Sequence, residues 1–160
     1  MAVDMFIKID KITGESRDSK HKNEIDVLSW SWGASQSGSF HVGGGGGAGK
    51  VNIQDLSITK WVDSSSADLL KACSKGTHIP KALLTVRKAG DKPLEYIKIL
   101  MEKVMVTSVS TGGSGGEDRL TENVTLNFAK VDFTYSSQKD DGSKDKELSY
   151  KWNIEENEEA

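Results

Sequence analysis

Leu28-Ser29-Trp30-Ser31-Trp32-Gly33 is a strict alternation of large apolar and small side chains, and a glycine-rich segment follows it over residues 43–49. Successive side chains of an extended chain point to opposite sides, so the alternation predicts a strand with two unlike faces. The predicted core face consists of Leu28, Trp30 and Trp32. The opposite face, which we predict to be smooth and small, consists of Ser29, Ser31 and Gly33.

The same period of two recurs along the chain and predicts a protein built mainly from strands. Alternating apolar residues occur within residues 5–9, 51–58, 84–86, 96–109, 124–135 and 148–152. The stretch 94–110 is longer than a typical single strand. We therefore expect it to bend, or to extend beyond the main sheet as part of a ribbon.

A single segment carries convincing helix signals. Residues 63–66 supply N-cap side chains, and Gly76 can end a helix in the left-handed conformation. The apolar face of this predicted helix, over residues 65–74, contains Leu69, Leu70 and Cys73. Many strands and one helix, joined by glycine-rich loops, predict a mainly β fold: a small antiparallel β-barrel or sandwich with one short flanking α-helix.

Length and composition indicate one domain with an ordinary charged surface. The chain has 160 residues and a formal net charge of −3, which does not indicate binding to nucleic acid or to an anionic membrane. Cys73 is the only cysteine, so no intrachain disulfide can form. We assign residues 1–153 to the barrel domain and residues 154–160 to an acidic, frayed carboxyl-terminal tail.

The amino terminus reads as a first strand, because Asp4 and Lys8 interrupt its short apolar pattern. No later segment has the apolar length needed to cross a bilayer, so we expect no direct membrane insertion. These patterns predict synthesis in the cytoplasm without a signal peptide, and export by a route that needs no leader.

Two glycine-rich segments resemble catalytic loops without the sequence context that such loops require. Residues 44–50 end in Gly49-Lys50 like a phosphate-binding loop, but Val51 stands where a magnesium-binding Ser or Thr is needed, and a strand pattern follows. Gly112 to Gly116 places Ser114 in a Gly-x-Ser-x-Gly pattern, but a strand pattern again follows where a helix is required. We favour structural loops in both places. A small nucleotide-binding enzyme using Gly49-Lys50, or a hydrolase using Ser114, remains the alternative.

The remaining reactive residues form no catalytic or metal-binding constellation. His21, His41 and His78 are far apart in sequence, and none has a cysteine or second histidine at metal-ligand spacing. We interpret each histidine as a surface or loop residue, and Cys73 as a small packed residue. The sequence therefore predicts no cofactor and no metal, and it favours a binding or structural role over an enzymatic one.

Three long segments resemble the Hcp family, the haemolysin-coregulated proteins that form the tube of bacterial type VI secretion systems. The resemblance runs nearly end to end and is carried by residues 1–9, 28–51 and 110–126. It implies an Hcp-like barrel that assembles into homohexameric rings. The rings would stack into a tube inside a contractile sheath, and the tube would be ejected with a spike protein and secreted effectors.

The resemblance also suggests which residues carry these contacts. A small polar surface that includes Ser29 and Ser31 is a candidate lining of the ring lumen, where effectors are carried. The candidate ring-stacking loop contains Gly43, Gly44, Gly45, Gly46, Gly47, Gly49 and Lys50, because glycines give such a loop reach and adaptability. We expect the outer strands, the helix around Leu69 and the 94–109 region to contribute to subunit contacts. A stand-alone effector is a third hypothesis.

Overall fold

The structure, a computed structural model, describes residues 3–38, 40, 49–90 and 93–160. Its elements follow the chain in this order: β1 (Val3–Ile9), β2 (Ile25–Ser31), β3 (Ala34–Ser35), β4 (Asn52–Ile53), β5 (Leu56–Trp61), α1 (Ser66–Lys75), β6 (Ile79–Lys88), β7 (Leu94–Thr111), β8 (Thr121–Gln138), β9 (Lys144–Asn153) and β10 (Glu158–Glu159). This mainly β architecture with one short helix confirms the predicted fold class.

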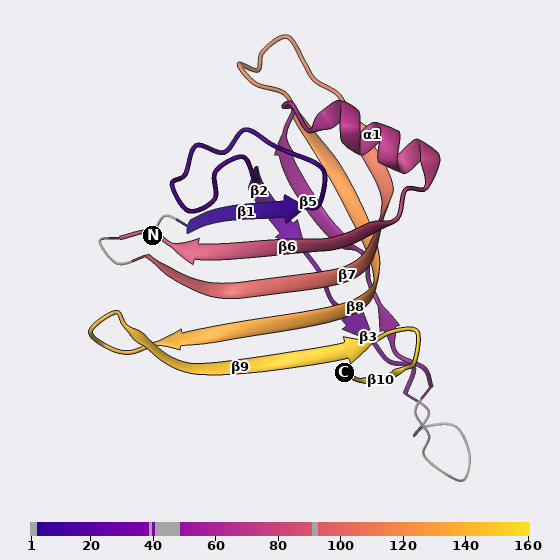
Figure 1. The fold of residues 1–160 in the computed structure, drawn as a ribbon, viewed down its shortest axis with the longest axis vertical. Coiled ribbons are helices and arrows are strands. Elements are labelled where there is room, and N and C mark those ends of the chain that lie inside the picture. Colours follow the sequence, from indigo (N-terminus) through magenta and orange to yellow (C-terminus); the bar gives the residue numbers. More distant parts are fainter. Residues whose placement is uncertain (1–2, 39, 41–48, 91–92) are drawn as a thin grey trace.

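Six antiparallel strands close into a barrel. The strand order is β8-β5-β2-β1-β6-β7, and β7 pairs back onto β8 to complete the circle. Strand β9 extends the sheet beyond β8, and helix α1 lies across one end of the barrel against β7 (Figure 1). The buried side chains of all six barrel strands form one apolar core, because every other residue of each strand points inward.

The long strand β7 bends as predicted. It contains 18 residues, and Lys103 at its midpoint has a φ of 56°. This left-handed residue interrupts the ladder between Glu102 and Val104, so β7 changes direction without ending. The residues of β7 before Lys103 pair with β6 and with residues 130–135 of β8. The residues of β7 after Lys103 pair with residues 122–128 of β8.

The alternation in β2 contains a β-bulge that the sequence did not reveal. The bulge lies between Val27 and Ser29, so Leu28 is 38% exposed and does not join the core. Its predicted core position is therefore wrong, because the extra residue resets which side chains point inward. Ile25 and Val27 fill the core before the bulge.

The two tryptophans after the bulge confirm the rest of the prediction. Trp30 and Trp32 are half-buried and pack against the core. The indole Nε1 of Trp32 donates a hydrogen bond of 2.9 Å to the backbone oxygen of Gln54, which fixes the chain just after β2.

Helix α1 begins one residue after the predicted start and ends at Gly76, which has a φ of 60°. Leu69 and Ala72 are buried and Cys73 is half-buried, so they form the inward face. Leu70 is 44% exposed, and the prediction that it shares this face is wrong. Ala72, Leu69 and Cys73 lie within about 100° of one another around the helix axis, whereas Leu70 lies about 60° beyond this arc and points toward the surface.

The last seven residues, which the sequence assigned to a tail, contain a short strand. After a turn, Glu158 and Glu159 form β10 and pair with Asn153 and Trp152 of β9. The backbone of Ile154 also donates a hydrogen bond of 2.8 Å to the oxygen of Ala129. The backbone of this acidic segment therefore pairs with both β9 and β8. Among the helices of the described residues, none is long and apolar enough to cross a membrane.

Candidate functional site

A continuous face of small, uncharged polar side chains covers the outside of four neighbouring barrel strands, β2, β5, β8 and β7. The strand registers arrange it in two rows across the sheet. One row contains Ser31, Ser57, Thr125 and Ser108. The other contains Ser29, Thr59, Asn123 and Ser110. We call these eight residues the small polar face.

The small polar face follows from the period of two in each strand. The residues between its members point into the core, where Ile58 is 1% exposed and Val124 is fully buried. Because one side of every strand is committed to the core, the opposite side is available to water or to a partner. Ser29 and Ser31 are both exposed on that opposite side, as the sequence predicted.

Hydrogen bonds between neighbouring strands hold part of this face in place. The hydroxyl of Thr59 donates to Asn123 Oδ1 at 2.7 Å, and the hydroxyls of Ser108 and Thr125 lie 2.6 Å apart. A bulge in β7 brings Thr107 into the same group, with its hydroxyl 2.7 Å from that of Thr125. The result is a surface that offers hydroxyl and amide groups at fixed positions and no charge.

Charged residues mark the two ends of the small polar face. At one end, Asp55 accepts hydrogen bonds from Thr107 at 2.8 Å and from Asn127 at 2.9 Å. At the other end, the guanidinium of Arg119 stacks 4.4 Å above the ring of Trp61. A hollow of about 410 Å³ surrounds this stack and is lined by Glu15, Arg17, Asp26, Trp61, Asp63 and Arg119. Burial raises the pKa of the Asp26 carboxyl there.

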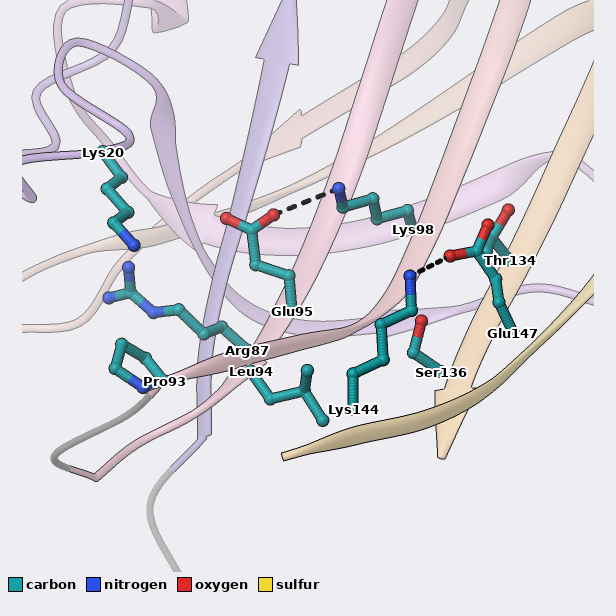
Figure 2. Close-up of a pocket in the computed structure, with 10 residues that line it drawn as sticks. All are labelled: Lys20, Arg87, Pro93, Leu94, Glu95, Lys98, Thr134, Ser136, Lys144 and Glu147. Carbon is teal, nitrogen blue, oxygen red and sulfur yellow. Dashed lines mark hydrogen bonds and ion pairs between the residues drawn. The ribbon is translucent and has the colours of Figure 1, made fainter. Parts of the chain in front are cut away.

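A second hollow lies at the hairpin ends of the sheet, away from the small polar face. Its volume is about 500 Å³, and Figure 2 shows that most of its charged side chains are engaged with one another. Lys98 lies 3.2 Å from Glu95, and Lys144 forms an ion pair with Glu147 that lowers the pKa of that carboxyl. These ion pairs leave no evident nucleophile and base arrangement among the lining residues (Figure 2).

The two motifs considered for an enzyme lack the structural context that catalysis needs. Lys50 is exposed, and the chain after it enters strand β4 where a phosphate-binding loop would enter a helix. Ser114 lies in an exposed loop that leads into strand β8, again where a nucleophile elbow would enter a helix. Within the described residues, no group of three or more His, Cys, Asp or Glu side chains could hold a metal ion.

The predicted stacking loop lies only partly within the described residues. Gly43, Gly44, Gly45, Gly46 and Gly47 fall outside them, whereas Gly49 and Lys50 are both described and exposed. The segment is flanked by the separate two-stranded sheet of β3 and β4, in which Ala34 pairs with Ile53. An added Cβ at Gly49 would approach the Ser37 hydroxyl to 2.5 Å, so the chain after β3 and the chain before β4 are close at that point.

Six residues of the small polar face were not identified from sequence. Ser57, Thr59, Ser108, Ser110, Asn123 and Thr125 alternate with apolar residues, just as Ser29 and Ser31 do. That alternation was a usable signal, but it did not say which strands are neighbours. His21 was also misjudged in part: it lies in a loop, as predicted, but it is buried.

Comparison with known proteins reveals close relatives along the whole chain. The family described as "Type VI secretion system effector, Hcp" matches residues 6–135. "Protein hcp1" of Pseudomonas aeruginosa is 63% identical, with both chains covered completely. The crystal structure of Hcp1 from Salmonella typhimurium is 37% identical with a TM-score of 0.80, and both chains are again covered completely. A structure described as a type six secretion system protein is 32% identical with a TM-score of 0.92, covering 99% of this chain and 100% of that one.

Proposed function

Because this chain belongs to the Hcp family of type VI secretion proteins, we propose that it forms hexameric rings that stack into a tube and carry effectors in their lumen. Hcp proteins are structural, secreted proteins of the type VI system and not enzymes. The chain would therefore act through self-assembly and cargo contact, with no chemical reaction of its own.

The small polar face is the observation that carries the lumen proposal. A surface that touches many cargo molecules in turn, and must release them, is suited by hydrogen-bonding groups without net charge, since each contact is modest in water. Its side chains are short, so they leave the passage open. Ser29 and Ser31 lie on the first strand of this face and would contact cargo directly.

A ring needs a surface patch on each subunit that fits a different patch on the next subunit. Such a head-to-tail interface gives a closed ring when the rotation from one subunit to the next adds up to a full turn. Strand β9 supplies one such patch. Its outer edge pairs with β10 only at Trp152 and Asn153, among the residues that the structure describes. Leu148 on this strand is 63% exposed, and Tyr150 is exposed beside it. An unpaired edge with exposed apolar side chains favours contact with a neighbouring subunit.

Further apolar residues extend the proposed contact area. Leu70 on α1 and Met105 on β7 are both exposed, and α1 packs on β7. They belong to the two regions for which the sequence predicted subunit contacts. We propose that β9 of one subunit and the region of α1 and β7 of the next form the interface.

Stacking of rings is assigned to the loop between β3 and β4, including Gly49 and Lys50. The small sheet of β3 and β4 lies outside the eight-stranded sheet that contains the barrel, so the loop begins away from the core. By family resemblance, the tube would meet a spike protein and a contractile sheath, and export would follow the type VI route from the cytoplasm.

The test substitutes Ser31, on the β2 strand of the small polar face. Ser31→Gln should leave rings intact by electron microscopy and sedimentation, while an effector co-expressed with the protein co-purifies several-fold less. The matched control is Ser19→Gln, because Ser19 is also an exposed serine but lies in the loop between β1 and β2. Equal effector recovery with both variants would contradict the lumen assignment, and monomers of the unsubstituted protein at micromolar concentration would contradict the ring.

A further inference from the structure

The connection between β1 and β2, residues 10–24, is an irregular segment that we call the strap. Its backbone is folded on itself: Gly14 N donates to Asn23 O at 2.8 Å, and Asn23 N donates to Ser16 O at 2.9 Å. The strap arches beside β1 at the end of the barrel (Figure 1). Side chains of the strap bind to β6 and β7, which are far from it in sequence. The position of the strap depends on those contacts.

His21 is the buried centre of this attachment. The residue is only 7% exposed, and its ring stacks on the ring of Phe6 in β1 with centroids 4.5 Å apart. Nδ1 lies 2.9 Å from Glu24 Oε2 in the strap itself. Nε2 lies 2.7 Å from Glu95 Oε1 on β7. Both ring nitrogens therefore face carboxylate oxygens at hydrogen-bonding distance.

The other charged groups around His21 are largely engaged with one another. They include Asp18, Lys20 and Glu24 on the strap, Glu95 and Lys98 on β7, Arg87 on β6 and Asp4 on β1. Arg87 binds Asp18 at 2.6 Å and Asp4 at 3.2 Å, and Lys98 binds Glu95 at 3.2 Å. Among these residues, the ion pairs of Glu24 are limited to His21.

The protonation state of the ring decides how many of the two contacts are favourable. An imidazolium donates from both nitrogens, whereas a neutral imidazole donates from one and presents a lone pair at the other. A lone pair facing a carboxylate oxygen at under 3 Å is repulsive. When both carboxylates are ionised, both observed contacts can thus be hydrogen bonds only if the ring carries a proton on each nitrogen.

We infer that His21 is a proton-dependent clamp that fastens the strap to β7 when charged and loosens it when neutral. Burial alone would raise the pKa of Glu95, but hydrogen bonds from His21 and Lys98 outweigh it and hold that pKa below its usual value. The Glu95 carboxylate therefore favours its ionised form, which accepts a hydrogen bond from the ring. The fastening is complete when the ring carries a proton on each nitrogen, and it is lost as the pH rises and the ring gives up one of them. This inference is independent of the ring and lumen proposals.

Nuclear magnetic resonance and hydrogen exchange on the full-length protein test the clamp. At pH 5.5 the His21 ring should show protons on both nitrogens. Between pH 5.5 and pH 8, exchange protection of the strap amides, corrected for intrinsic rates, should fall about tenfold relative to barrel amides, since one charge-assisted hydrogen bond is lost. His21→Gln, which cannot change charge, should abolish this pH dependence. His78→Gln is the matched control, because His78 is exposed, and it should leave the dependence unchanged.

Three results would overturn the clamp. The first is equal protection of the strap at both pH values, and the second is a pH dependence that survives in His21→Gln. If that variant fails to fold, the wild-type titration decides: strap resonances that do not move as His21 loses its proton would be the third. Strap resonances that follow the His21 titration would support the clamp without any variant.

Discussion

Lys60 on β5 is the most deeply buried charge in the barrel, and its removal should destabilise the fold strongly. The side chain of Lys60 is fully buried, and it forms an ion pair with Glu122 on β8, whose side chain is 1% exposed. The ammonium also lies 3.1 Å from Asp63, just before α1. Ser66, the first residue of α1, donates to the same Glu122 oxygen at 2.6 Å. One cation therefore holds together β5, β8 and the start of the helix.

Lys60→Met nearly keeps the length of the side chain but removes the cation that the carboxylates of Glu122 and Asp63 share. An exposed ion pair would contribute about 0–1 kcal/mol. Here solvent reaches neither partner, so the penalty for an unpaired buried charge applies almost undiminished, and we expect a loss of about 3–5 kcal/mol in the free energy of unfolding. That is a large share of the roughly 5–15 kcal/mol that stabilises a typical domain.

Urea unfolding followed by tryptophan fluorescence, at one fixed protein concentration, measures this loss. The control is the double variant Lys60→Met with Glu122→Leu, which replaces the pair by apolar side chains and should recover most of the stability, because no unpaired charge remains at Glu122. The loss of stability in the single variant, measured against the unsubstituted protein, should also become smaller in acid, where a carboxylate left without its cation can take up a proton. A loss below about 1 kcal/mol in the single variant, or an equal loss in the double variant, would refute the reasoning.

Two further predictions concern the surface and the acid response. Leu148→Glu should convert rings to smaller species by sedimentation while leaving the circular dichroism of the subunit unchanged, since the side chain is 63% exposed in the single chain; rings that persist would remove β9 from the interface. The hydrogen bonds from Arg87 hold the pKa of Asp18 well below its usual range. The ionised Asp18 therefore contributes to the stability of the fold at any pH above the ordinary aspartate pKa of about 3.9. This contribution is lost progressively as the pH falls below that value. Carbon-detected titration should thus find the Asp18 carboxyl ionised at pH 3, and Arg87→Lys should raise the pKa of Asp18. An Asp18 carboxyl that titrates with an ordinary aspartate pKa in the unsubstituted protein would contradict the Arg87 contact.

The sequence predicted the local structure of this protein well because that structure depends on periodicity. Alternation identified most of the strands, and the length of residues 94–110 predicted the bend that Lys103 makes. The error at Leu28 has a physical cause of the same local kind. A bulge adds one residue to one strand of a pair, and whether it forms depends on the partner strand β5, which lies elsewhere in the sequence.

The contacts that decide the interior and the candidate site depend instead on which strands become neighbours. Lys60 and Glu122 are 62 residues apart, and His21 and Glu95 are 74 residues apart, so no spacing rule connects either pair. The small polar face also depends on which strands become neighbours. Each of its four strands carries a recognisable alternation, but only closure of the barrel in the order β2, β5, β8 and β7 places these alternations side by side with the same phase. A shift of one residue in any of these registers would turn that strand's polar residues into the core. The buried Lys60 group, which ties β5 to β8, therefore helps to keep in phase the strands that form the small polar face.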